Sequence, residues 1–143
     1  MLSHSELVLI GSRWLKTVKK MPVIATELTV SGSREIPDVL GFRSTLTILL
    51  EAKATRCDFL RDKYKPERKG TLVGVGNYRA FICEPDVIAI DDLPPRWGLL
   101  HVINKQVHEI VFPKGNMFAD ESLWHESDSK AERSFLYSLL IRK

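Results

Sequence analysis

The first apolar pattern in the chain has the period of an α-helix. Its members recur every three or four residues and are Leu7, Ile10, Trp14, Val18 and Met21. A single apolar face of this kind predicts an amphipathic helix that packs on a core. Ser3 and Glu6 form a capping-box pattern that predicts the helix start, and Pro22 predicts its end.

Strand-like patterns follow. Val23–Val30 predicts a β-strand, which is closed by a turn at 31–33. The next strand carries Asp38 and is expected to break at Gly41. Thr45–Ala54 has an apolar core without a charge before Glu51, which is typical of a central strand that is covered on both faces.

The rest of the chain alternates helical and strand patterns in the same way. A short helix is expected at Arg56–Tyr64, followed by a polar loop at Glu67–Gly76 that contains Gly70, Gly74 and Gly76. Three strands are expected at 78–83, 97–103 and 106–112. A last helix follows a capping box formed by Ser129 and Glu132, and its expected buried face consists of Phe135, Leu136, Leu139 and Leu140. This order predicts one α/β domain over residues 1–143, with a central mixed β-sheet flanked by helices.

Composition restricts the class of protein and its expected location. The chain is 44% hydrophobic and 27% charged, which is ordinary for a globular protein, and no apolar run reaches the roughly 20 residues of a membrane span. The N-terminus shows no signal peptide, and Cys57 and Cys83 fit no metal-binding spacing. Two free thiols predict a reducing, cytoplasmic location. The four histidines have no paired ligand spacing, so zinc is not expected.

Two acids and a lysine gather at the strand that ends with Ala54. Side chains alternate faces along a strand, so Glu51 and Lys53 project from the same side of the sheet. If the strand that carries Asp38 pairs with this one, a second carboxylate joins them. Carboxylates that converge repel one another, and a divalent cation is the counter-ion that such a cluster favours.

The residues Pro37-Asp38 followed by Glu51-Ala52-Lys53 resemble the signature of the PD-(D/E)xK nuclease superfamily, which has the restriction-endonuclease-like fold. The run EAKATRCDFLRDK is similar to the ExKxSRxDF stretch of a bacterial DNA-repair branch of that superfamily. The resemblance extends from about Glu27 to Tyr78. It implies a metal-dependent deoxyribonuclease that acts in DNA repair, in recombination or in the processing of mobile-element or phage DNA.

The resemblance also implies roles for individual residues. Asp38, Glu51 and the Ala52 backbone carbonyl would hold Mg²⁺ or Mn²⁺, and Asp38, Glu51 and Lys53 would form the catalytic set. Glu27, Asp58 and Tyr78 would support that set. Glu6 is either a metal ligand from the first helix, as in some nucleases of this fold, or only the capping acid. The Gln-x-x-x-Tyr helix of some exonuclease branches is absent, so a processive DNA-end nuclease is not expected.

A basic stretch directly follows these acids. Between Lys53 and Lys69 lie seven positive and three negative residues, although the net charge of the whole chain is only +3. Its candidate phosphate contacts, with one from the next strand, are Arg56, Lys63, Lys65, Arg68, Lys69 and Arg79. The alternative is a solvated surface loop.

The expected partners are DNA and, for specificity, a second copy of the chain or another protein, with no membrane. The competing interpretation is a module that binds nucleic acid or protein and keeps the nuclease fold without cutting.

Overall fold

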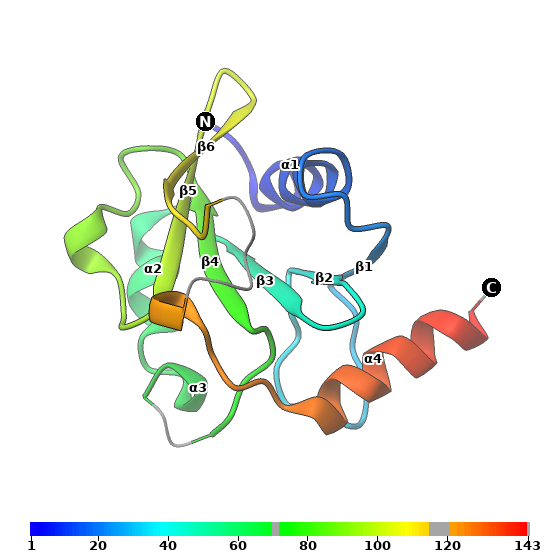
Figure 1. Cartoon of the computed structure of the whole chain (residues 1–143). Helices are drawn as coiled ribbons and strands as arrows, with labels where there is room; N and C mark the ends of the chain where they lie inside the picture. Colours follow the sequence, from blue (N-terminus) through cyan, green and yellow to red (C-terminus); the bar gives the residue numbers. More distant parts are fainter. Residues whose placement is uncertain (70–71, 115–120, 143) are drawn as a thin grey trace.

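One six-stranded sheet, whose strands lie side by side in chain order, forms the centre of the molecule (Figure 1). The strands are β1 (Val23–Thr26), β2 (Val39–Phe42), β3 (Thr47–Ala52), β4 (Tyr78–Cys83), β5 (Trp97–Ile103) and β6 (Gln106–Val111). β4 is parallel to β3 and to β5, and the other neighbouring strands are antiparallel. The predicted mixed sheet is therefore confirmed. The computed structural model describes residues 1–69, 72–114 and 121–142.

Helices cover both faces of this sheet. They are α1 (His4–Thr17), α2 (Arg56–Asp62), α3 (Pro66–Lys69) and α4 (Ser129–Ile141), and short 3-10 turns lie at Ile90–Asp92 and Glu121–Leu123. Leu7 and Leu15 of α1 belong to the apolar core on one face, whereas Phe59 of α2 and Phe135 of α4 belong to the core on the other face. None of the helices in the described ranges is long and apolar enough to cross a membrane.

β3 is buried over its whole length, as its apolar sequence predicted. Ile48 and Leu50 face the core under α1, and Leu49 faces the core under α2 and α4. Because side chains alternate along a strand, Glu51 points to the same face as Leu49, toward α2. The alternation thus carries a carboxylate into the interior at the end of a central strand.

Gly41 does not break β2, contrary to the prediction. It pairs with Ile24 on one side and Ile48 on the other. A Cβ atom at this position would lie 3.0 Å from Leu15 Cδ1 and 3.2 Å from Met21 Sδ. The glycine therefore lets α1 and the chain after it lie close on the sheet, which is a requirement of packing and not of a turn.

The predicted ends of three elements were wrong by two to four residues. β1 ends at Thr26 and not at Val30, because Glu27 has a φ of 48°, which a strand cannot contain. β3 covers Thr47–Ala52 instead of Thr45–Ala54, and α2 ends at Asp62 instead of Tyr64.

The predicted polar loop at Glu67–Gly76 also differs. It begins with the helical turn α3, and Gly74 and Gly76 are buried. Gly76 has a φ of 100°, which only glycine adopts without strain. Gly70 lies outside the described residues.

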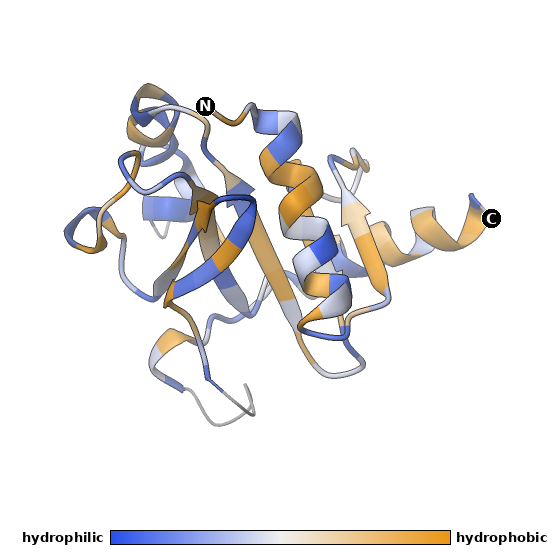
Figure 2. Cartoon of the chain, turned by 90° about the horizontal axis from the view of Figure 1, so that it is seen from above, coloured by the Kyte–Doolittle hydropathy of each residue, from blue (hydrophilic) through white to orange (hydrophobic). Residues whose placement is uncertain are grey.

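Both terminal helices depart in part from their predicted faces. The capping box of α1 is present as predicted, but Val18 is exposed beyond the helix end and Val8 is buried instead. α4 is capped by Asp128, whose side chain accepts a hydrogen bond from Ala131 N, and not by Ser129. Its last turns, which are largely hydrophobic, extend toward the C-terminus (Figure 2). Leu136 and Leu140 are 43% and 65% exposed.

Candidate active site

An open polar pocket of about 420 Å³ lies at the C-terminal end of β3. Asp38, Glu51 and Lys53 all line it, together with Ala52 and Asp58. The pairing of β2 with β3 places Val39 opposite Leu50, so the residue before β2 comes beside the last residues of β3. Sheet register therefore joins two motifs that are thirteen residues apart in the chain.

Backbone N–H groups hold both carboxylates across the strand pair. Asp38 Oδ2 accepts a hydrogen bond of 2.8 Å from Ala52 N, and Glu51 Oε2 accepts one of 3.1 Å from Asp38 N. The N–H and C=O of one residue in an extended strand point to the same side, so the Ala52 carbonyl also faces the Asp38 side. Asp38 is 17% exposed and Glu51 is 1% exposed, so one acid is accessible and the other is interior.

Lys53 is placed by an acid that the sequence did not single out. Its Nζ donates a hydrogen bond of 2.9 Å to Asp62 Oδ1, and both side chains are almost fully buried. Asp62 is the last residue of α2, so the helix that follows the motif returns a carboxylate to the lysine. Burial acts to raise the pKa of Asp62, but Arg68 and Lys53 outweigh it and the pKa is lowered overall.

Arg68 connects the acids of the interior. Its Nη2 lies 3.0 Å from Glu51 Oε1, its Nη1 lies 2.9 Å from Glu35 Oε2, and its Nε lies 2.6 Å from Asp62 Oδ2. The guanidinium, whose side chain is 1% exposed, also lies 4.4 Å from the centre of the Trp97 ring. Burial acts to lower the pKa of Arg68, but the three acids raise it well above its usual range, so the residue stays charged.

The basic neighbours of Glu51 do not offset the effects of its burial and of the nearby acids on its pKa. Burial, then the charges of Asp38 and Glu35, raises its pKa to about 8, and Arg68 and Lys65 do not compensate. Glu35 Oε1 is the only buried side-chain nitrogen or oxygen among the described residues that has no hydrogen-bond partner. A cation next to Asp38 and Glu51 would relieve this repulsion.

His4 completes the accessible side of the pocket. Its Nε2 lies 3.2 Å from Asp38 Oδ1, and its Nδ1 lies 3.3 Å from Glu27 Oε1. One ligand atom from each of these three residues lies within 4.8 Å of the others. Sequence patterns do not single out His4, because no second histidine stands at ligand spacing from it. Glu6, the residue weighed from the same helix, bonds to the Ser3 backbone and is a capping acid.

The donor set fits a hard divalent cation such as Mg²⁺ or Mn²⁺. Asp38, Glu51, Ala52 and His4 line one pocket, and Glu27 lies beside it against His4. Carboxylate and carbonyl oxygens are the ligands that these ions prefer. Burial and the nearby acids favour the protonated form of Glu51, and a bound cation would favour its ionised form.

Two of the predicted supporting residues lie at the pocket and one does not. Glu27 contacts His4, and Asp58 lines the pocket and pairs with Arg61. Tyr78 begins β4 opposite Ile48, at the other end of the strand from Glu51. Its ring packs edge-on to Trp124 in the core under α1, so a role next to Lys53 is not compatible with its position.

The predicted DNA-contacting residues separate into two groups. Lys63 and Lys69 are exposed, and Lys65 is 40% exposed and reaches to 3.6 Å from Glu51 Oε1. Arg68 and Arg79, in contrast, have buried side chains, which does not agree with surface phosphate contacts. Arg79 donates to the carbonyls of Gly76 and Glu126, and its burial lowers its pKa to about 10.

Arg56 is exposed but engaged elsewhere. It donates two hydrogen bonds to Asp92 and one to the Val87 carbonyl, and its guanidinium holds the pKa of Asp92 at about 2. The contact joins the start of α2 to the loop after β4. The sequence could not predict the Arg56–Asp92 pair or the burial of Arg68 and Arg79, because residues that contact them lie far away in the chain.

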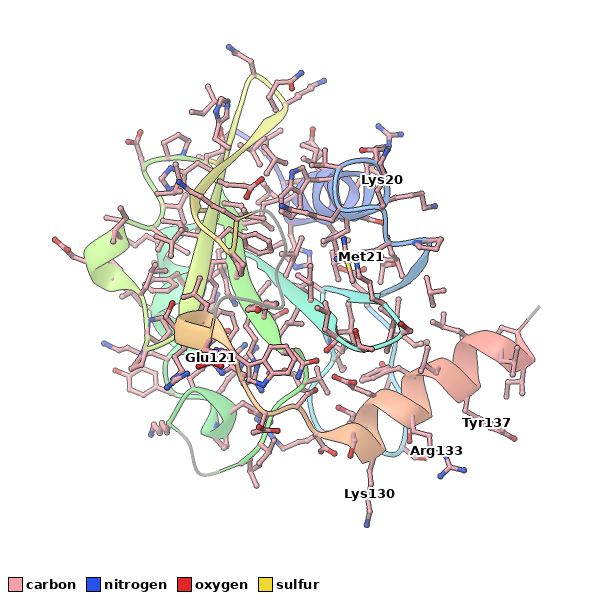
Figure 3. All side chains as sticks on the ribbon, viewed as in Figure 1. Lys20, Met21, Glu121, Lys130, Arg133 and Tyr137 are labelled. Carbon is pink, nitrogen blue, oxygen red and sulfur yellow. The ribbon has the colours of Figure 1, made fainter. Side chains whose placement is uncertain are left out.

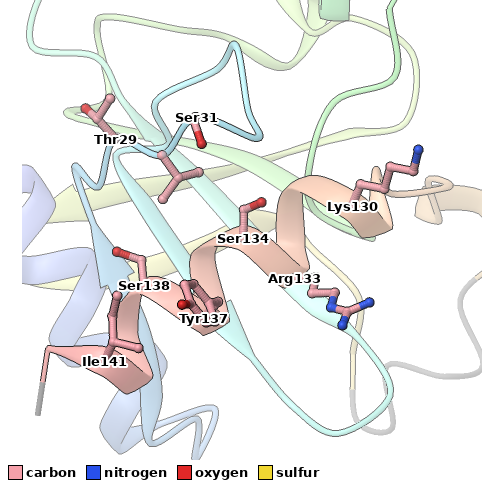
Figure 4. Close-up of a pocket in the computed structure, with 9 residues that line it drawn as sticks. Thr29, Ser31, Lys130, Arg133, Ser134, Tyr137, Ser138 and Ile141 are labelled. Carbon is pink, nitrogen blue, oxygen red and sulfur yellow. The ribbon is translucent and has the colours of Figure 1, made fainter.

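A second groove, of about 460 Å³, runs along α4 (Figure 4). Thr29, Ser31 and Tyr137 are among the residues that line it, and its lining includes Lys130 and Arg133 but no carboxylate. Without acids it has no metal-binding set, so the pocket at the end of β3 is the candidate active site.

No known protein family and no curated protein matches this sequence. Among solved structures, the chain is similar to SPO1766, a protein of unknown function from Silicibacter pomeroyi, at 16% identity and a TM-score of 0.69. The similarity covers 99% of this chain and 89% of that one. At this identity it shows the fold, a single α/β layer structure with a six-stranded mixed sheet, and it leaves the activity to be inferred from the site.

Proposed function

We propose that this protein is a metal-dependent nuclease that hydrolyses phosphodiester bonds in DNA. The observation that carries the proposal is the meeting of Asp38, Glu51 and Lys53 at one polar pocket, where the Asp38 carboxylate accepts from Ala52 N and the Glu51 carboxylate accepts from Asp38 N. A fold needs no such set for stability, because buried charges cost more than well-packed apolar residues.

Each residue has a distinct task. Asp38, Glu51, the Ala52 carbonyl and His4 would hold Mg²⁺ or Mn²⁺. The bound ion would polarise the scissile phosphate and lower the pKa of a coordinated water. Lys53, held by Asp62 on the wall of the pocket, offsets the negative charge that develops on the phosphate oxygens. Arg61 and Lys65, which line the rim, attract the phosphate backbone.

The competing function is a DNA-binding module that does not cut. The contacts of Arg68 and Lys65 with Glu51 favour it, because they already supply that acid with positive charge. Metal-dependent turnover separates the two functions.

The test combines metal binding with cleavage. Calorimetry should detect Mg²⁺ or Mn²⁺ binding that is lost in Asp38→Asn, and a labelled panel of single-stranded, nicked, flapped and junction DNAs should be cut only with metal. Lys53→Met should lower the cleavage rate on the order of 10²-fold or more while metal still binds, since the charge it removes acts mainly in the transition state.

Lys130→Met, changed at an exposed lysine on α4, is the matched control and should cut like the parent. If the parent binds both metal and DNA but cuts no member of the panel, the non-cutting module replaces the nuclease. Equal cleavage by Lys53→Met removes this lysine from the mechanism.

A further inference from the structure

An exposed aromatic ring lies in the turn between α2 and α3. The side chain of Tyr64 is on the surface, with 65% of the residue exposed. Its neighbours in the chain fix its position: Tyr64 N donates to the Arg61 carbonyl and Lys65 N donates to the Asp62 carbonyl. The ring is therefore carried by a tight hydrogen-bonded turn and not by an extended loop.

This turn forms part of the rim of the candidate active site. Lys65, the next residue in the chain, and Arg61, three residues before Tyr64, both line the pocket. The Lys65 ammonium lies 3.2 Å from Asp62 Oδ1 and 3.6 Å from Glu51 Oε1. Consecutive Cα atoms are about 3.8 Å apart, so Tyr64 stands next to the entrance.

Two lysines accompany the ring. Lys63 Nζ and Lys69 Nζ lie 5.4 Å and 5.7 Å from its centre. Neither ammonium has a carboxylate within 4.0 Å among the residues that the structure describes, in contrast to Lys53 and Lys65, which are ion-paired. Both positive charges therefore remain available to an anionic partner.

An exposed aromatic ring with two lysines that have no carboxylate partner suits single-stranded nucleic acid. A base stacks on the ring in place of the ammonium groups that lie over it, and those groups meet the neighbouring phosphates. Inside a duplex the faces of each base are covered by the adjacent pairs, so the ring can stack on an unpaired base and not on an internal paired one.

We propose that Tyr64, flanked by Lys63 and Lys69, is a stacking platform for an unpaired base of DNA next to the active-site pocket. The inference rests on the proposed nuclease function and specifies its substrate class: DNA with a single-stranded segment, such as a flap or an overhang.

The experiment measures binding without cleavage. Fluorescence anisotropy in EDTA gives the affinity for a labelled oligothymidylate of about 12 nucleotides. Tyr64→Ala should weaken binding on the order of 10-fold, and Tyr64→Phe should bind like the parent because the ring is retained. Affinity for a blunt duplex of equal length should not change in Tyr64→Ala.

Tyr137 supplies a matched control, because it is 64% exposed and lies on α4 (Figure 3). Tyr137→Ala should bind the oligonucleotide like the parent. The platform is overturned by any of three results: unchanged affinity in Tyr64→Ala, an equal loss of affinity in Tyr137→Ala or in Tyr64→Phe, or no binding by the parent. Cleavage of the DNA panel distinguishes the two proposals. If binding depends on Tyr64 but no DNA is cut with metal, only the proposed nuclease activity is rejected. If DNA is cut but binding does not depend on Tyr64, only the stacking platform is rejected.

Discussion

At the scale of single residues, Glu51 differs most from an ordinary carboxylate. It lies in an interior group with Glu35, Asp62, Lys53 and Arg68, and the half-exposed Lys65 reaches it from the pocket. Burial and the nearby acids make the ionised form of Glu51 costly in the metal-free protein. A bound cation would favour that ionised form, so the residue whose ionisation destabilises the fold is the one that the proposed function needs.

This imbalance predicts a pH dependence of stability. The pKa of Glu51 is raised in the folded protein to about 8 from its usual 4.5, so the folded state binds more protons than the unfolded state between these values. The free energy of unfolding should therefore fall as pH rises from about 5 to about 8. Glu51→Gln removes the ionisable group and leaves two acids against two bases, so its stability should vary less over this range.

Urea unfolding of the parent and of Glu51→Gln without divalent metal, at several pH values in that window, measures the difference. Asp86→Asn, changed at an exposed position, should keep the slope of the parent. Parallel slopes in the parent and in Glu51→Gln would show that Glu51 is ionised throughout the range and that Arg68 compensates its charge.

At the scale of elements, helix α4 shows that a local sequence pattern can misplace the helix N-cap by one residue. Ser129 and Glu132 match a capping box, yet Asp128 is the cap, and Glu132 bonds instead to Thr47 of β3 and to Ser127. The strand supplies a partner that the helix sequence does not reveal. The N-cap of α4 is therefore Asp128, one residue before the N-cap that the motif predicts.

The two assignments of the cap predict different mutational effects. Asp128→Ala removes the side-chain acceptor for Ala131 N and should lower the free energy of unfolding by about 1 kcal/mol. Ser129→Ala, one position later, should change it little, because Ser129 is the first helical residue and is exposed. Thermal or chemical unfolding checks both variants, and a larger loss in Ser129→Ala would restore the sequence-based cap.

At the scale of the whole molecule, the distribution of charge matters more than the net charge of +3. Of the basic residues near the pocket, Arg68 forms ion pairs in the interior and Arg56 forms one with Asp92. Four other cations there have exposed or half-exposed side chains: Lys63 and Lys69, and Arg61 and Lys65, which also pair with Asp58 and Asp62. A phosphate backbone would thus meet one short segment around the turn between α2 and α3.

This distribution predicts a modest dependence of DNA affinity on salt. Each contact between a cation and a phosphate of single-stranded DNA contributes about −0.7 to the slope of log affinity against log salt, so four contacts give roughly −3. Lys63→Ala combined with Lys69→Ala should reduce the slope by about 1.4. Anisotropy titrations from low to moderate salt measure it.

Lys130→Ala combined with Arg133→Ala removes the same charge from α4 and is the control, expected to keep the slope of the parent. A slope that falls equally in both double variants would mean that DNA responds to net charge and not to the segment beside the pocket.

The sequence by itself determined the central strand and the order of all the strands and of helices α1, α2 and α4, but not the short helix α3. Alternation along β3 placed Glu51 and Lys53 on one face, and the apolar run before them required burial on both faces. The capping box of α1 was likewise readable, because Ser3 and Glu6 contact each other within one turn. Patterns of this kind depend on neighbours in the chain, so they survive without knowledge of the fold.

Only the tertiary structure decided which charges meet. Lys53 is held by Asp62, Glu51 by Arg68, and Asp38 by His4, and these pairs join residues on different elements. It also decided that Arg79 is interior and that Leu140 is exposed, although their side chains suggest the reverse. The reason is physical: burial and ion pairing depend on which segments the sheet and its helices bring together, and a side chain's own chemistry does not specify its neighbours.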